Sequence, residues 1–144
     1  MRLRALAKIN LGLDVIGKRE DGYHEVRMIM QTINMYDQLE IEKKDEPGIS
    51  ITTNLPFIPT DERNLVYKAA KLLMDEFDIQ EGITVELQKF IPVAAGMAGG
   101  SSDAAATMIG MNRLFNLGLT EKEMMKRAVA IGADVPYCLL RGTA

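Results

Sequence analysis

The sequence predicts an α+β domain built as a mixed β-sheet with helices on one face. Apolar and polar residues alternate along Leu3–Val15 and again along Ile83–Leu87, which is the pattern of half-buried strands. Between these segments, apolar residues recur at three- and four-residue spacing over Asp61–Phe77, which indicates an amphipathic helix. A glycine-rich segment then leads into an alanine-rich helical pattern, so strands and helices follow one another along the chain.

The composition is that of one ordinary globular domain. The chain has 144 residues, of which 47% are hydrophobic and 26% are charged, and its net charge of −3 gives no bulk attraction to nucleic acid or to an anionic membrane. No apolar run approaches membrane-spanning length, and Met1–Arg4 lacks the apolar stretch of a signal peptide. The only cysteine, Cys138, is expected to be buried. We therefore expect a cytoplasmic protein with no nucleic-acid or membrane partner; the oligomeric state is not predicted.

Turn signals divide the first half of the chain into strands. The Asp21–Gly22 turn precedes a strand predicted over about Val26–Tyr36. Leu39–Ile41 and Ile49–Ile51 predict two further short strands. The charged run Lys43–Gly48 between them is interpreted as a solvated turn.

Helices dominate the second half. The Asp61–Phe77 helix is expected to begin at Asp61, and the helix after the glycine-rich segment is expected to continue to about Asn116. Thr120–Glu123 has the spacing of a capping box, which predicts a further helix over Met124–Ile131.

The glycine-rich segment is the first candidate binding site. Glycines let a backbone approach a ligand closely, and a helix that begins directly afterwards offers unpaired N–H groups and the positive end of its dipole to an anion such as phosphate. The segment lacks the lysine of a Walker A loop and the spacing of a dinucleotide fingerprint, so a purely structural glycine turn stays open as the alternative. The candidate residues are Pro92, Val93, Ala94, Ala95, Gly96, Met97, Ala98, Gly99, Gly100, Ser101 and Ser102.

Polar residues outside that segment are further candidates. Lys8 and Asn10 share one face of the first strand, where a solvated polar face is the alternative. Tyr23 and His24 follow a turn and could stack on and hydrogen-bond a planar ligand, or simply pack against each other. Asp134 is expected between a helix and an apolar strand, a position that holds catalytic carboxylates well, with an ordinary turn aspartate as the alternative.

These stretches together resemble one superfamily. Ala7–Leu11, Pro92–Ala106 and Gly132–Pro136 resemble, in this order, motifs of the galactokinase–homoserine kinase–mevalonate kinase (GHMP) superfamily, whose fold is of the ribosomal protein S5 domain 2-like type. Asp21–His24 makes the resemblance closer to the kinases of that superfamily that act in non-mevalonate isoprenoid biosynthesis. The resemblance extends over essentially all of the chain.

The resemblance implies ATP-dependent phosphorylation, assisted by Mg²⁺, of the 2-hydroxyl-bearing erythritol moiety of a cytidine diphosphate-linked methylerythritol. The Pro92–Ser102 segment would wrap the ATP phosphates, and Lys8 and Asp134 would match the catalytic pair. In such a pair, Asp134 accepts the proton of the attacking hydroxyl and Lys8 stabilises the developing negative charge. The hydroxyl of Ser101 or Ser102 could hold the Mg²⁺, and the sequence leaves that choice open.

The resemblance also assigns binding residues outside the glycine-rich segment. Asn10, Tyr23 and His24 would hold the substrate, and Lys89 and Asn64 would line the nucleotide pocket. It further implies that residues 1–144 form the ATP-binding N-terminal domain and that the C-terminal domain of the superfamily is absent, so that weak nucleotide binding and poor or no turnover are expected. Another small-molecule kinase of the superfamily, or a non-catalytic nucleotide-binding or interaction domain, stays open as an alternative.

Overall fold

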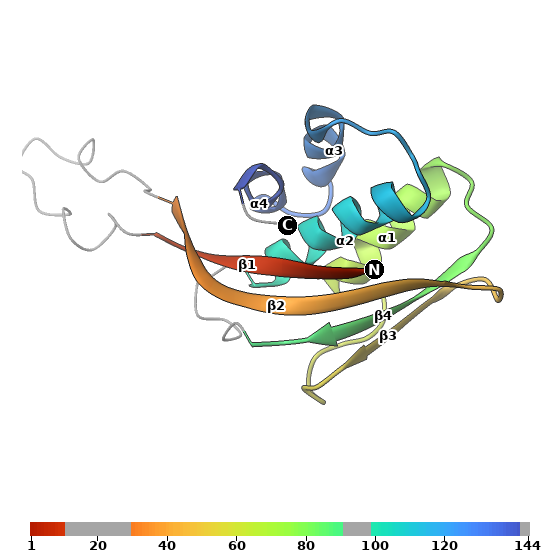
Figure 1. Cartoon of the computed structure of the whole chain (residues 1–144), viewed down its shortest axis with the longest axis horizontal. Helices are drawn as coiled ribbons and strands as arrows, with labels where there is room; N and C mark the ends of the chain where they lie inside the picture. The colour runs from red at the N-terminus through yellow and green to blue at the C-terminus, as the bar shows by residue number, and fades with distance from the viewer. Residues whose placement is uncertain (11–29, 91–98, 142–144) are drawn as a thin grey trace, which may run out of the picture.

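The computed structural model describes residues 1–10, 30–90 and 99–141 (Figure 1). Candidate residues Tyr23 and His24 and the segment 92–98 lie outside the described residues. None of the described helices is long and apolar enough to cross a membrane. The elements, in chain order, are β1 (Arg2–Asn10), β2 (Met30–Lys44), β3 (Ile49–Thr53), α1 (Leu65–Glu76), β4 (Gly82–Gln88), α2 (Gly99–Leu114), α3 (Glu121–Ala128) and α4 (Val135–Arg141).

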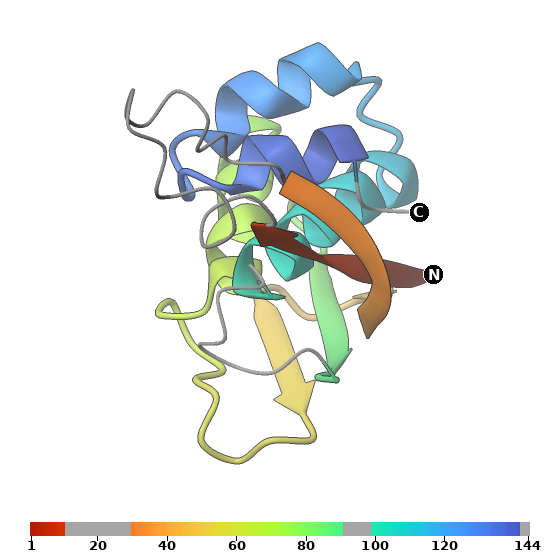
Figure 2. The same cartoon turned by 90° about the vertical axis from the view of Figure 1, so that its left-hand side faces the viewer.

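The described strands form one mixed sheet, as the sequence predicts. Its order is β1-β2-β4-β3, with antiparallel β1–β2 and β2–β4 pairs and a parallel β3–β4 pair. The described helices all lie on one face of this sheet, as Figures 1 and 2 show from perpendicular directions. The predicted fold class is therefore confirmed.

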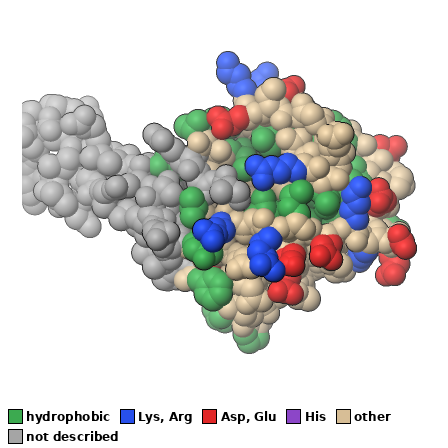
Figure 3. Space-filling model, viewed as in Figure 1, with side chains coloured by type: hydrophobic (Ala, Val, Ile, Leu, Met, Phe, Trp, Pro, Cys, Tyr) green, Lys and Arg blue, Asp and Glu red, His purple; other side chains and the backbone are tan. Residues whose placement is uncertain are grey.

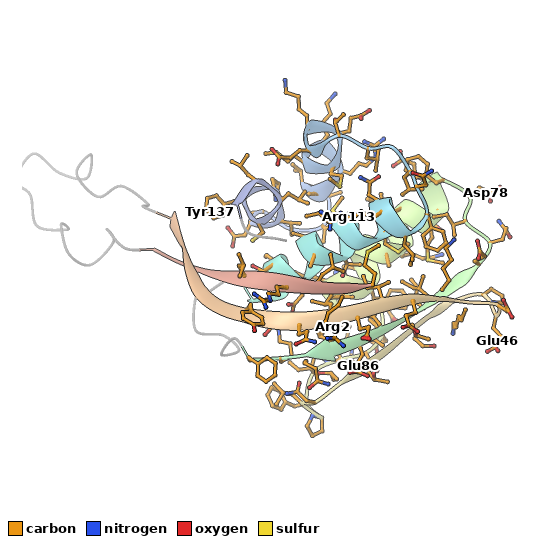
Figure 4. The ribbon with its side chains drawn as sticks, in the orientation of Figure 1. Arg2, Glu46, Asp78, Glu86, Arg113 and Tyr137 are labelled. Atoms are coloured by element: carbon orange, nitrogen blue, oxygen red, sulfur yellow. The ribbon has the colours of Figure 1, made fainter. Side chains whose placement is uncertain are left out.

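Alternation along the strands separates a buried face from a polar one. Side chains facing the helices are almost completely buried, among them Leu3, Ala5, Leu39, Ile41, Ile83, Val85 and Leu87. Arg2 and Glu86 lie on the side of the sheet away from the helices (Figure 4). In the view of Figure 3, basic and acidic side chains are interspersed, so this side of the molecule carries no large surface of one charge.

Helix α2 packs directly on the sheet because it carries a glycine at the contact. A Cβ added at Gly110 would lie 2.8 Å from Ile41 Cδ1 and 2.9 Å from Leu3 Cδ1. The missing side chain lets the helix approach β1 and β2 closely, and α2 contacts both strands. This contact fixes the helix that begins after the glycine-rich segment.

The strand prediction needs two corrections. β2 runs unbroken from Met30 to Lys44, so Leu39–Ile41 belongs to it and is not a separate strand. Asp37, which lies between the two predicted strands, is buried and paired with a lysine, so the strand continues through it. In β1, the register shifts between Leu6 and Lys8, so the alternation does not run unchanged along the strand.

Two helix boundaries also differ from the prediction. α1 begins at Leu65 rather than Asp61, because Asn64 is the N-cap and its Oδ1 accepts from Val66 N at 2.8 Å. The Thr120–Glu123 capping box is confirmed, but it starts α3 at Glu121, so the helix lies earlier than predicted and ends at Ala128.

Helix α2 ends slightly earlier than expected, and the last element is a helix where a strand was predicted. α2 ends at Leu114, and Asn116 then adopts a left-handed conformation with φ of 55°. The stretch after Asp134 was predicted as a strand but forms helix α4. Its buried residues Val135, Cys138 and Leu139 have helical spacing, which a short apolar run does not distinguish from a strand.

Candidate functional site

The hydroxyl of Ser102 joins three elements at one end of the sheet. It donates a hydrogen bond to the main-chain carbonyl of Leu6 in β1 and lies 3.4 Å from Cys138 Sγ in α4. Ser102 itself belongs to the start of α2 and is 1% exposed. The start of α2, the second half of β1 and the first turn of α4 therefore meet at one place, which Figures 1 and 2 show.

The first turn of α2 is suited to an anion. The helix begins at Gly99, is 16 residues long and has no acidic residue in its first turn, so no carboxylate of that turn offsets the positive end of its dipole. Gly100 is exposed, and a Cβ there would have its nearest contact at 3.6 Å, with Leu65 Cδ1. Among residues 1–10, 30–90 and 99–141, no side chain would therefore obstruct a phosphate group that approaches the backbone at Gly100.

Asp134 lies at the start of α4. Its main-chain carbonyl accepts from Cys138 N at 3.2 Å, which makes it the residue from which the helix begins, and it is exposed. Cys138, one turn into the same helix, contacts Ser102. The structure therefore places Asp134 in an exposed turn of the helix that packs against the beginning of α2.

Lys8 lies in the part of β1 that follows Leu6, where it pairs with Thr32 of β2. Asn10 pairs with Met30 at the end of the same strand. The side chains of both residues lie outside the described part of the structure. Their backbone positions are two and four residues beyond the Leu6 carbonyl that Ser102 contacts.

The two residues expected to line the nucleotide pocket both have structural contacts. Asn64 caps α1, and its Nδ2 donates to Pro59 O at 2.8 Å. Lys89 is 8% exposed, and its ammonium group lies between two buried carboxyl groups. Their predicted contacts with a nucleotide stay predictions.

The carboxyl groups beside Lys89 belong to Asp37 and Asp103, and sequence analysis did not single out this cluster. Lys89 Nζ lies 2.9 Å from Asp37 Oδ2 and 2.6 Å from Asp103 Oδ2. Burial raises the pKa of Asp103 well above its usual range, and hydrogen bonding to Asp37 acts in the same direction. Burial opposes the charge of Lys89, but the attraction of Asp103, supported by Asp37, outweighs it, so the pKa of Lys89 is raised.

Alternation in the sequence could have revealed part of this cluster. Asp37 continues the buried series with Leu39 and Ile41, and Lys89 continues the buried series with Val85 and Leu87. Two charged residues of opposite sign on the buried face of strands that pair with each other predict an internal ion pair. The contact of Asp103 depends on the packing of α2 and has no comparable signal in the sequence.

The fold is therefore an α+β domain in which the start of α2 meets β1 and α4. The chain belongs to the GHMP kinases N-terminal domain family, which matches residues 64–142, more than half of its length. The match includes the start of α2 and Asp134 but not β1.

Curated relatives extend the similarity to the whole chain. The 4-diphosphocytidyl-2-C-methyl-D-erythritol kinase of Lachnospira eligens is 60% identical over 144 residues, which are 100% of this chain and 50% of that relative. The protein of the same name from Lachnoclostridium phytofermentans is 61% identical over 142 residues, which are 99% of this chain and 49% of that relative. The chain thus spans about half the length of these relatives.

Solved structures support the same fold. A crystal structure of 4-(cytidine 5'-diphospho)-2C-methyl-D-erythritol kinase matches with a TM-score of 0.76 and 34% identity, covering 100% of this chain and 50% of that protein. The mevalonate kinase of Methanococcus jannaschii matches with a TM-score of 0.75 and 17% identity, covering 99% of this chain and 52% of that protein, which shows a shared fold alone.

Proposed function

We propose that the chain binds ATP phosphates at the start of α2 and forms the nucleotide-binding part of an ATP-dependent small-molecule kinase. The observation that carries this proposal is the contact of Ser102 with Leu6 and Cys138, because it brings the helix start, the strand of Lys8 and the helix of Asp134 to one place. The family of the chain supports a kinase, and its family relatives include proteins named as kinases.

In the proposed reaction, the parts of the site have separate tasks. The N–H groups at the start of α2 bind phosphate oxygens, and Gly100 lets them approach. The oxygen of the substrate hydroxyl forms a bond to the γ-phosphorus of ATP, and Asp134 accepts the proton that this hydroxyl loses. The bond between the γ-phosphorus and the oxygen that leaves with ADP breaks. The ammonium group of Lys8 stabilises the negative charge that develops in this transfer.

Mg²⁺ would supply further neutralisation of phosphate charge, and Ser101 is the residue proposed to hold it. The choice between the two serines depends on their surroundings. Ser102 is buried and its hydroxyl donates to Leu6, whereas Ser101 is only partly buried in the same first turn. A hydroxyl must be accessible to join a metal bound to nucleotide phosphates.

The proposed acceptor substrate is the cytidine diphosphate-linked methylerythritol that gives the relatives their names. Asn10, Tyr23 and His24 are the residues proposed to hold it, and a further domain like the remainder of the relatives would complete the site. We place the reaction in the cytoplasm. The single cysteine, which is buried, is in keeping with a reducing compartment.

An Asp134→Asn variant tests this proposal. Transfer of phosphate from ATP to the methylerythritol substrate and equilibrium binding of MgATP are measured with the unmodified protein and the variant. The proposal predicts that the variant loses transfer and retains MgATP affinity, because a side-chain amide cannot accept the proton as the carboxylate does. Equal transfer by both proteins would contradict the role of Asp134.

A further inference from the structure

The buried cluster of Asp37, Lys89 and Asp103 joins the two ends of the glycine-rich segment. Lys89 directly follows β4, and Asp103 lies near the start of α2, so their 2.6 Å contact connects the residues before and after positions 91–98. Asp37 in β2 contributes the second carboxyl group, 2.9 Å from the same ammonium group. One side chain thus connects three elements where the candidate phosphate site begins.

The backbone around Lys89 is fixed from both sides. Lys89 N donates to Asn54 Oδ1 at 2.8 Å, and Asn54 Nδ2 donates to Lys89 O at 3.2 Å. The next amide, Phe90 N, donates to Asp37 Oδ1 at 2.6 Å. The end of β4 is therefore held by side chains from the end of β3 and from β2, which leaves Lys89 little freedom to follow a displaced helix.

The charged groups of the cluster are shielded from water. Burial and the neighbouring carboxyl group raise the pKa of Asp103, while Asp103 and Asp37 raise the pKa of Lys89 against the effect of its burial. The exposed fractions are 8% for Lys89, 0% for Asp37 and 1% for Asp103, so water contributes little to balancing these charges. Such buried ion pairs add little net stability compared with apolar residues but depend strongly on geometry.

We infer that Asp37, Lys89 and Asp103 are positioning residues for the phosphate site, because they hold the start of α2 in a fixed place relative to the end of β4. This inference rests on the proposed binding of nucleotide at the start of α2. A phosphate ligand depends on the alignment of several N–H groups at once, so a small displacement of the helix start lowers affinity without unfolding the domain.

The main test is a Lys89→Met variant, which removes the charge and keeps an unbranched side chain. A Glu76→Gln variant is the matched control, because it breaks an ion pair with Arg127 that joins α1 to α3 away from the cluster. MgATP affinity is measured by calorimetry, and hydrogen exchange is measured at the amides of residues 103–106, which bond to the first carbonyls of α2. We expect Lys89→Met to weaken MgATP binding about tenfold and to accelerate that exchange about tenfold relative to α3, and Glu76→Gln to do neither.

A Lys89→Met variant that folds and leaves both the exchange and the MgATP affinity unchanged would overturn the inference. If Lys89→Met does not fold, the Asp37→Asn/Lys89→Met double variant removes the ammonium group together with one of its two carboxyl partners and is tested in the same way. Failure of this double variant to fold would make the cluster a stability element and would also overturn the inference. Absence of MgATP binding in the unmodified chain would instead contradict the proposed function, while the exchange data would still report whether the cluster holds α2.

Discussion

The hydroxyl of Ser102 donates a hydrogen bond to the main-chain carbonyl of Leu6, across 96 residues of sequence. This bond attaches the start of α2 to β1 two residues before Lys8. The same hydroxyl lies 3.4 Å from Cys138 in α4, the helix that begins at Asp134. The residues expected to form a catalytic pair therefore come from two elements that share this one contact.

The two adjacent serines are expected to respond in opposite ways to replacement by alanine. Ser102→Ala removes the hydroxyl that donates to the Leu6 carbonyl and should lower the free energy of unfolding by about 1–2 kcal/mol. Ser101→Ala should change it by less than about 0.5 kcal/mol but should weaken binding of MgATP. Urea unfolding and calorimetry measure the two quantities, and an identical response of both variants would contradict the assignment of separate roles.

The Gly100→Ala variant is expected to have different effects on stability and on ligand binding. The added Cβ has an ordinary 3.6 Å contact with Leu65, and the residue lies within a helix, so the free energy of unfolding should be unchanged or raised by up to about 1 kcal/mol. The same methyl group would obstruct a phosphate at the helix start, and MgATP affinity should fall. A variant that binds MgATP normally would show that no ligand approaches Gly100 closely.

The raised pKa of Asp103 gives a pH dependence with a definite sign. In the unfolded chain the carboxyl group of Asp103 loses its proton at about pH 4, whereas in the folded protein it keeps the proton to a higher pH. The contribution of this group to the stability of the fold is therefore complete below about pH 4 and is lost as the pH rises through the pKa of the folded protein. The free energy of unfolding of the unmodified chain minus that of Asp103→Asn should therefore fall as the pH is raised above about 4. A difference that is constant or that rises with pH would show that Asp103 is ionised in the fold.

The ion pair between Glu76 and Arg127 should contribute little to stability. Its atoms are as close as 2.5 Å, but the side chains are 38% and 26% exposed. Glu76→Gln should thus lower the free energy of unfolding by at most about 1 kcal/mol, and by less in high salt. A larger loss that persists in concentrated salt would contradict this expectation and would disqualify the variant as a control for Lys89→Met.

Local patterns in the sequence predict much of the fold. Alternation locates β4, helical spacing and the capping box locate α1 and α3, and the glycine-to-alanine transition locates α2. The type of α4 is not predictable in this way, because Val135–Leu140 is too short for its spacing to exclude a strand. The continuity of β2 is missed for another reason: the burial of Asp37 depends on a lysine 52 residues later in the chain.

Local sequence patterns predict less of the candidate site than of the fold. Composition and spacing indicate Gly100 and Ser101 as candidate binding residues. They do not show that the Ser102 hydroxyl donates a hydrogen bond to β1 or that Asn64 caps α1. Those roles arise from contacts between elements. The roles of Lys8 and Asp134 come from the resemblance to the superfamily and stay predictions.

The most direct test of the proposed site is a titration of the chain with MgATP followed by the backbone amide signals in NMR spectra. The amides of Gly99 to Ser102 and those of Lys8 and Asp134 should shift together and saturate with one dissociation constant, while those of Glu46 and Asp78, at the other end of the molecule (Figure 4), should not move. Saturable shifts that leave the start of α2 unaffected, or an absence of saturable shifts anywhere, would contradict a nucleotide-phosphate site where α2, β1 and α4 meet.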